Sequence, residues 1–351
     1  MDLLRSLAIA AVVWAHSRRS LLPAFGEGLP GLFPIDGVSL FFVLSGFLIG
    51  RIIFRTVEGQ KPAELLRFYR RRWWRTLPNY YLFLVVQIAF YLGLGISELI
   101  DWRCWIFGQN LFTPNTLFFR ESWSLAVEEW FYVLFPLLWF VGLRLGLWHT
   151  TRSFFFLILG ILLLMTLGKG FYFLSIQSLQ PFVEHPGLSR LPVVFRMSSI
   201  LWGVAMAALF IHRPQVRRMP RVFALSGVFV LSAGVWLLGQ AGGYWYRVFI
   251  YDVHSLGVAL LFPLLLRIPA PTGETFGRLR GFIERMSKFS YSTYLINLPL
   301  MSLVAWWIER EQWTDPAPVV LLVMGAYAVL WFASALVYRH FEKPLTDLRD
   351  R

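Results

Sequence analysis

The stretch from Arg5 to His16 reads RSLAIAAVVWAH and is apolar except for Ser6 and its two ends. In a helix, at about 100° and about 1.5 Å per residue, eleven residues return to nearly the same face and carry His16 about 16 Å along the axis from Arg5. Ionisable side chains are costly inside a bilayer and usually mark function there. We therefore expect a membrane helix in which Arg5 holds an anion near the surface and His16 lies near the bilayer centre. The alternative is a helix-end anchor and a histidine satisfied by a neighbouring helix.

The composition extends this expectation to the whole chain. Of its 351 residues, 57% are hydrophobic and 15% charged, and the mean hydropathy is +0.58, whereas soluble domains are about 45–50% apolar and about 25% charged. Apolar stretches of membrane length recur throughout. We predict an all-α, polytopic membrane protein with a single domain (1–351) and about ten transmembrane helices, at roughly 3–22, 36–54, 76–96, 124–143, 153–174, 196–211, 222–239, 248–267, 288–308 and 318–338.

The charges predict how these spans are oriented. The net charge is +13, and 24 of the 33 basic residues fall at the ends or in the connections that this segmentation places on one side. The positive-inside rule then predicts a multi-pass protein with both termini in the cytoplasm and with membrane lipids, not nucleic acid, as its anionic partners. The single cysteine, Cys104, excludes an internal disulfide and a cysteine-rich metal site, and we expect no metal.

A basic run, RFYRRRWWRTLP, occupies residues 67–78. Arg72 and Arg75 are three residues apart and Arg71 and Arg75 four apart, so in a helix each pair shares a face. Guanidinium groups bind phosphate oxygens bidentately, and the neighbouring tryptophans could stack on a purine. Positive-inside anchoring would also explain the run, but we favour phosphate binding by Arg71, Arg72 and Arg75.

Two further stretches carry polar residues at membrane depth. In ESWSLAVEEWFY (121–132), Glu128 needs a partner, for which His16 is our candidate. In GVSLFFVLSGFLIG (37–50), Ser45 and Gly46 are small residues that favour close helix packing. Asp36, just before that stretch, is either a loop cap or faces the site. A rival pair, Asp252 and His254, is only two residues apart and would diverge on a helix.

Together these stretches resemble the membrane acyltransferase 3 family of bacterial integral-membrane O-acyltransferases that modify glycans. The resemblance is carried by Asp2 to His16, Gly37 to Gly50, Arg72 to Pro78 and Trp123 to Pro136, by FSYSTYLINLP (289–299) and by FEKP (341–344). It implies a protein of the bacterial cytoplasmic membrane that takes a cytoplasmic acetyl-CoA, or another short acyl-CoA, as co-substrate and acylates a hydroxyl of a glycan or glycoside acceptor.

The resemblance also assigns residues. The essential arginine and histidine of the family correspond to Arg5 and His16, and its Arg-x-x-Arg pair to Arg72 and Arg75. The family commonly has an aspartate where Ser39 stands and a histidine where Asn297 stands. These two departures concern the acceptor side, for which the candidates are Asp36, Ser45, Trp123 and Asn297.

Acyl transfer from a thioester to an alcohol needs a base, stabilisation of the developing oxyanion and groups that hold the donor. An imidazole, with an ordinary pKa of about 6.5, suits the base. We assign catalysis to His16, Arg5 and Glu128 and favour direct general-base transfer over an acyl-histidine intermediate. The alternatives are a transporter or flippase of an anionic lipid-linked sugar, against which stands the lack of an inverted repeat, and a non-catalytic membrane subunit. The sequence fixes neither the acceptor, the acyl length, the oligomeric state nor the role of Cys104.

Overall fold

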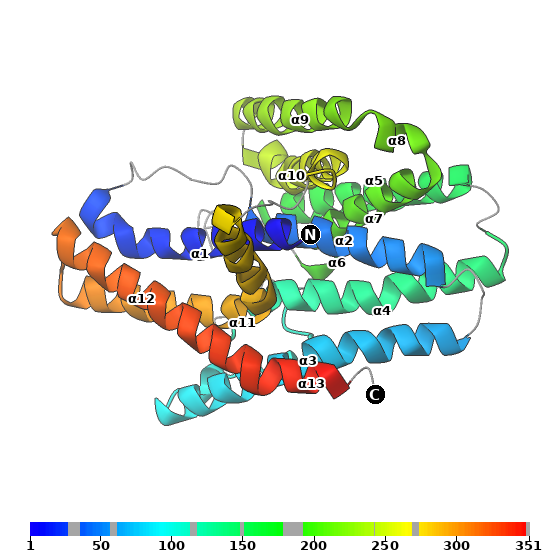
Figure 1. Cartoon of the computed structure of the whole chain (residues 1–351). Helices are drawn as coiled ribbons and strands as arrows, with labels where there is room; N and C mark the ends of the chain where they lie inside the picture. The colour runs from blue at the N-terminus through cyan, green and yellow to red at the C-terminus, as the bar shows by residue number, and fades with distance from the viewer. Residues whose placement is uncertain are drawn as a thin grey trace.

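The apolar stretches form long helices in the computed structural model, shown in Figure 1. It describes residues 1–26, 36–56, 62–112, 118–147, 151–177, 192–241, 243–268 and 274–348, and among these there is no strand. The α-helices are α1 (Asp2–Phe25), α2 (Gly37–Thr56), α3 (Pro62–Gly93), α4 (Ser122–Arg144), α5 (Thr151–Gln177), α6 (Val193–Arg196), α7 (Ser198–His212), α8 (Pro214–Arg218), α9 (Pro220–Ala241), α10 (Gly243–Leu265), α11 (Glu274–Arg310), α12 (Pro316–Val337) and α13 (Lys343–Leu348). Short 3₁₀ helices lie at Ser97–Leu99 and Trp102–Ile106, and a π-helical turn, η4, lies at Tyr338–Glu342.

The prediction of an all-α polytopic membrane protein is confirmed. Eight of the ten expected spans are, within the described residues, helices long and apolar enough to cross a membrane. The other two expected spans lie in α1 and α11, helices of 24 and 37 residues whose polar side chains lower their hydropathy. A total of ten spans therefore stays a prediction.

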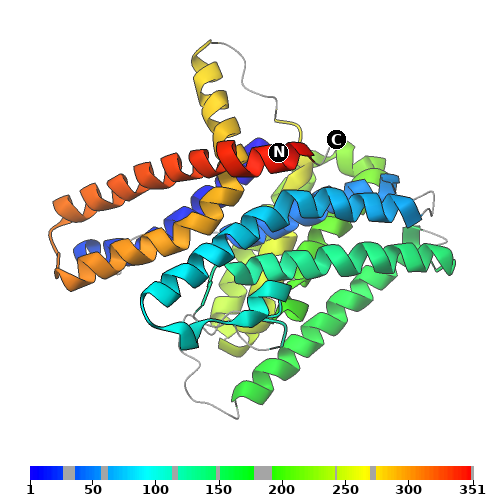
Figure 2. The same cartoon turned by 90° about the horizontal axis from the view of Figure 1, so that it is seen from below.

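The helices pack in two groups that meet in the middle of the molecule. On one side α1, α11 and α12 lie together, and on the other α2 packs on α7 and α10 on α9 (Figures 1 and 2). The α2–α7 contact depends on glycine, because a Cβ on Gly46 would overlap the carbonyl of Ile200 and one on Gly203 the carbonyl of Val43. The packing role expected for Gly46 is thus confirmed.

Several helix boundaries differ from the expected ones. α3 begins at Pro62 and continues through Pro78, so the basic run at 67–78 is part of the same helix as the third expected span. α11 begins at Glu274, well before the expected 288, and its first turns project from the body in Figure 2. A proline inside a helix breaks one backbone hydrogen bond but need not end the helix when neighbouring helices hold it.

Candidate functional site

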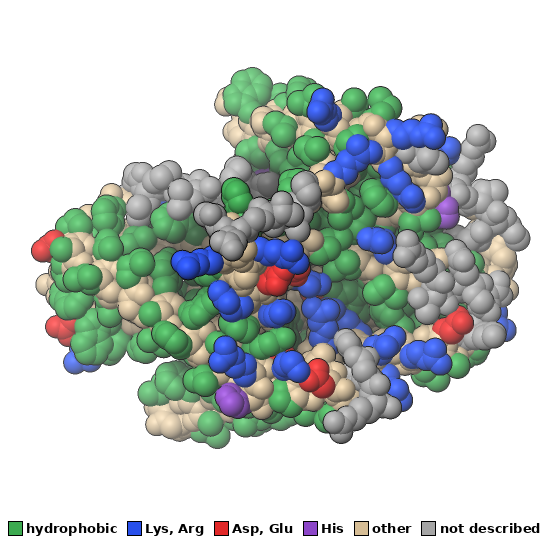
Figure 3. All heavy atoms as spheres, in the orientation of Figure 1, with side chains coloured by type: hydrophobic (Ala, Val, Ile, Leu, Met, Phe, Trp, Pro, Cys, Tyr) green, Lys and Arg blue, Asp and Glu red, His purple; other side chains and the backbone are tan. Residues whose placement is uncertain are grey.

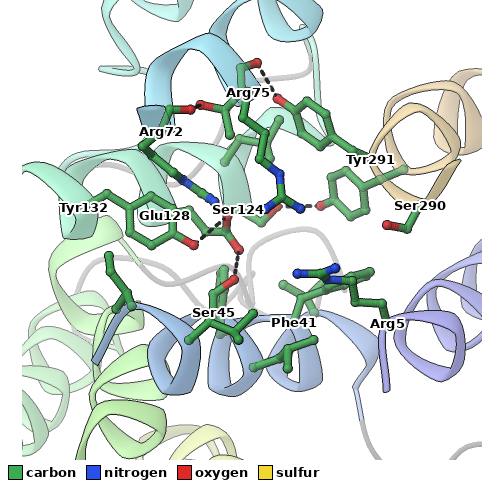
Figure 4. A pocket seen from close by; sticks show the side chains of 18 of the residues that line it. Arg5, Phe41, Ser45, Arg72, Arg75, Ser124, Glu128, Tyr132, Ser290 and Tyr291 are labelled. Carbon is green, nitrogen blue, oxygen red and sulfur yellow. Dashed lines mark hydrogen bonds and ion pairs between the residues drawn. The ribbon is translucent and has the colours of Figure 1, made fainter. Parts of the chain in front are cut away.

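A cavity of about 300 Å³ lies where the two helix groups meet, a volume at the lower end of small-molecule sites. Helices α1, α2, α3, α4 and α11 contribute its walls, and Figure 4 shows their side chains pointing into it. Basic side chains also gather over the middle of the face shown in Figure 3. The lining includes Arg5, Phe41, Ser45, Arg72, Arg75, Ser124, Glu128, Tyr132, Ser290, Tyr291 and Tyr294.

Glu128 is the centre of a hydrogen-bonded network on one wall. Arg72 Nη2 donates to Glu128 Oε2 over 3.1 Å, Tyr132 Oη donates to the same oxygen over 3.2 Å, and Ser45 Oγ donates to Oε1 over 3.0 Å. The Arg72 guanidinium also lies 3.8 Å from the centre of the Tyr132 ring. Because Ser124, Glu128 and Tyr132 follow one another at four-residue spacing, α4 presents all three on the same face.

Two other arginines reach the cavity without such a network. Arg5 enters from α1 and Arg75 from α3 (Figure 4). Neither guanidinium has a hydrogen bond or ion pair with a side chain in the described part of the chain, in contrast to Arg72. A guanidinium at a cavity wall favours an anionic ligand that can accept its hydrogen bonds. Arg71, which we expected to bind phosphate together with Arg72 and Arg75, is exposed on α3 and does not line the cavity.

His16 does not pair with Glu128, so this prediction is wrong for the two described side chains. Glu128 is occupied by Arg72, Ser45 and Tyr132, and His16 instead meets Asn297 of α11, with 2.6 Å between His16 Nδ1 and Asn297 Nδ2. The pair is close to the cavity, because Asn297 follows the cavity residue Tyr294 by three positions on α11 and so lies on the same face.

The two remaining acceptor-side candidates, Asp36 and Trp123, belong to a different cluster, around Arg196 of α6. Asp36 caps α2 by accepting from the backbone N–H groups of Val38 and Ser39, and its Oδ2 accepts from Arg196 Nη2 over 2.9 Å. Trp123 is buried, with its ring 5.6 Å from the Arg196 guanidinium. Asp36 is therefore the loop cap of the first alternative and does not line the cavity.

Tertiary contacts also explain the rival pair, Asp252 and His254. Asp252 forms an ion pair with Lys169 of α5 and accepts from the indole N–H of Trp202 over 3.2 Å. His254, two residues on, is not part of that ion pair. Asp252 thus serves to neutralise a buried lysine.

Sequence reasoning missed several residues of these clusters. Tyr132 could have been found from its four-residue spacing after Glu128. Arg196 and Lys169, both nearly inaccessible to solvent, could have been flagged as ionisable residues inside apolar stretches. Tyr294 offers no such signal, because an aromatic residue on an apolar helix is usual.

Comparison with known proteins adds evidence of family. The sequence pattern of a family described as "Acyltransferase domain" matches residues 1–338. The peptidoglycan O-acetyltransferase OatA of Listeria monocytogenes is 24% identical over 371 aligned residues, which cover 98% of this chain and 55% of OatA. The chain thus spans about half the length of that relative. The O-acetyltransferase OatA of Staphylococcus aureus is 29% identical over 39% of this chain and 24% of its own length. The putative peptidoglycan O-acetyltransferase YrhL of Bacillus subtilis is 29% identical over 41% of this chain and 24% of its own length. No solved structure matches.

Proposed function

The chain belongs to the membrane acyltransferase 3 family, and on that premise we propose that it is an O-acetyltransferase whose donor is acetyl-CoA or another short acyl-CoA. The acceptor is a hydroxyl group of a glycan, and the names of the relatives favour peptidoglycan. The single observation that carries the proposal is the cavity into which Arg5 and Arg75 project without a side-chain partner in the described residues. CoA is a polyanion, so its phosphates suit these two groups.

The charges support a cytoplasmic entrance for the donor. The cavity is lined by arginines of the basic run on α3, which the positive-inside rule places at the cytoplasmic surface. The acceptor then approaches from the opposite side of the membrane, in the direction in which α1 runs from Arg5 to His16. This orientation places both termini in the cytoplasm.

In this mechanism His16 accepts the proton of the acceptor hydroxyl as the oxygen attacks the thioester carbonyl carbon. A carbon–oxygen bond forms, and the tetrahedral intermediate then loses the CoA thiolate as the carbon–sulfur bond breaks. The imidazolium returns its proton to that thiolate, so the protein ends unchanged. Arg5, about 16 Å away along α1, holds the donor's phosphates and does not touch the carbonyl. Glu128 positions Arg72 through their ion pair.

The test combines binding and transfer on the detergent-purified protein. Calorimetry with acetyl-CoA and 3′-dephospho-CoA measures the donor site, and transfer of radiolabelled acetyl to peptidoglycan oligosaccharides measures catalysis. We expect His16→Ala to bind acetyl-CoA as the native protein does and to transfer no acetyl group. We expect Arg75→Ala to bind it more weakly by about 1.5–3 kcal/mol, the contribution of a hydrogen bond to a charged group.

The control is Arg103→Gln, which removes an exposed arginine that is paired with Asp101 and does not line the cavity. This variant should bind acetyl-CoA and transfer the acetyl group normally. Full transfer by His16→Ala would exclude His16 as the base. A folded native protein that binds no acetyl-CoA would favour the transport alternative instead.

A further inference from the structure

A buried carboxamide on α11, that of Asn297, contacts the His16 ring. Asn297 has no exposed surface, and its Nδ2 lies 2.6 Å from His16 Nδ1. Its Oδ1 is buried and has no hydrogen-bond partner among the described residues. Buried carbonyl oxygens are rarely left unpaired. With Nδ2 facing the ring, the amide leaves its Oδ1 acceptor unpaired, although the nearby Nδ1 of His16 could donate to it.

The two ends of a carboxamide are nearly equal in shape, so the same contact accommodates either orientation. With Nδ2 towards the ring, Nδ1 of His16 accepts, and a neutral imidazole then carries its proton on Nε2. With Oδ1 towards the ring, Nδ1–H of His16 donates and Nε2 keeps its lone pair. Only the second tautomer offers Nε2 as a base.

The proton transfer itself selects the second orientation. Once His16 has taken a proton, both ring nitrogens carry hydrogen and both are donors. A carboxamide N–H facing Nδ1–H would then place two donors against each other, whereas Oδ1 accepts from Nδ1–H in both the neutral and the charged ring. A single amide orientation thus serves the whole catalytic cycle.

We propose that Asn297 is a positioning residue whose Oδ1 accepts from His16 Nδ1–H, so that Nε2 is the atom that receives the proton of the acceptor hydroxyl. The inference rests on the proposed function, because it assumes that His16 is the base. It replaces Glu128 as the expected partner of His16 and moves Asn297 from the acceptor side to the support of the base.

The surrounding contacts hold the two side chains in register. α1 and α11 pack along much of their length. One residue beyond His16, Ser17 Oγ donates to the carbonyl of Val13 over 2.6 Å and accepts from Tyr327 Oη over 2.8 Å. The packing of α1 on α11 and the hydrogen bond from Tyr327 of α12 limit rotation of α1, so the Asn297 amide meets one defined side of the ring.

The test compares Asn297→Leu, which has a similar shape and no acceptor, with Asn297→Asp, which keeps an acceptor oxygen. Asn297→Ala is made alongside, so that one acceptor-free variant has no added bulk. The matched control is Ser20→Ala, which removes another α1–α11 hydrogen bond one turn away. For each variant, thermal unfolding and acetyl-CoA binding establish that the fold and the donor site are intact, and steady-state transfer gives kcat and KM.

We expect Asn297→Leu and Asn297→Ala to lower kcat by about 10²-fold or more, since general-base catalysis contributes about 10²–10⁴-fold. KM for acetyl-CoA should stay within about a factor of 2, because ground-state binding is untouched. Asn297→Asp should restore most of kcat, and Ser20→Ala should keep the native values.

The outcomes separate this inference from the proposed function. If His16→Ala is inactive while a folded Asn297→Leu or Asn297→Ala variant keeps the native kcat, the inference is wrong and the proposed function stands. If Asn297→Asp is as slow as Asn297→Leu, an acceptor at Nδ1 does not suffice and the inference is also wrong. If His16→Ala is active, the base assignment fails whatever the Asn297 variants do.

Discussion

The ion pair between Arg72 and Glu128 offers a quantitative test, because it is expected both to stabilise the fold and to present a donor-binding group. Breaking a buried pair by removing one partner costs about 3–5 kcal/mol, whereas an exposed pair contributes about 0–1 kcal/mol. The two side chains here are 20% and 16% exposed. We therefore expect Arg72→Ala to lower the free energy of unfolding by about 2–3 kcal/mol, between these limits and nearer the buried one.

Replacing the acidic partner instead, in Glu128→Gln, should lower the free energy of unfolding by less. Glu128→Gln keeps an oxygen that accepts from Ser45 and leaves Arg72 over the Tyr132 ring, a contact that contributes about 0.5–2 kcal/mol. The double variant Arg72→Ala/Glu128→Gln no longer has an uncompensated carboxylate. It should therefore be more stable than Arg72→Ala alone, with a coupling energy of about 1–2 kcal/mol.

The assay is unfolding in mixed detergent and SDS micelles for the four members of the cycle, with acetyl-CoA calorimetry on the same samples. Stability should partly recover in the double variant, but acetyl-CoA affinity should not, because the guanidinium is still absent. A coupling energy below about 0.5 kcal/mol would refute the structural role of the pair. Restored acetyl-CoA affinity in the double variant would show that Arg72 only neutralises Glu128 and does not hold the donor.

Three further predictions follow from other parts of the structure. Gly203→Ala places a Cβ against the carbonyl of Val43 and should destabilise the α2–α7 contact by about 1–3 kcal/mol in the same unfolding assay. The control Gly239→Ala, where a Cβ meets open space, should not lower the stability. Phe41→Ala removes a ring from the cavity wall and should raise the ratio of butyryl to acetyl transfer; an unchanged ratio would place the acyl group elsewhere. Burial raises the pKa of the Cys104 thiol to about 12, so maleimide at pH 8 should label the protein only after unfolding in SDS; labelling of the native protein would contradict the buried thiol.

The helices could be predicted from the sequence because the bilayer imposes a simple rule on composition. A spanning helix must be apolar over about 20 residues, and eight of the expected segments meet that condition in the structure. Helix ends were less predictable. The charged stretch before Pro78 looks like a connection by hydropathy, yet α3 runs through it from Pro62, because snorkelling arginines and neighbouring helices stabilise a helix beyond the apolar part.

The candidate site was predictable only where one helix carries the relation. The face shared by Arg72 and Arg75 and the spacing of Ser124 and Glu128 follow from helical periodicity, and all four residues line the cavity. The partners across helices did not follow. The sequence suggested that His16 and Glu128 pair with each other, because both needed a partner. In the structure, the packing of α1 on α11 brings His16 against Asn297, and the packing of α3 on α4 brings Glu128 against Arg72. No local pattern encodes those registers.

The separation of Arg5 from His16 itself discriminates between the possible substrates. Both residues lie on α1, about 16 Å apart along the axis, so no single small group can contact both. Arg5 lines the cavity, whereas His16 contacts Asn297 of α11, and neither of these two residues lines it. A compact anion such as inorganic phosphate would engage Arg5 and leave the histidine without a role. A donor with phosphates at one end and a thioester at the end of a long, thin arm would engage both at once. Because both residues lie on one helix, this spacing is fixed, and the proposed function requires a donor arm long enough to span it. The spacing therefore favours an intact acyl-CoA over a short acyl thioester as the substrate of this site.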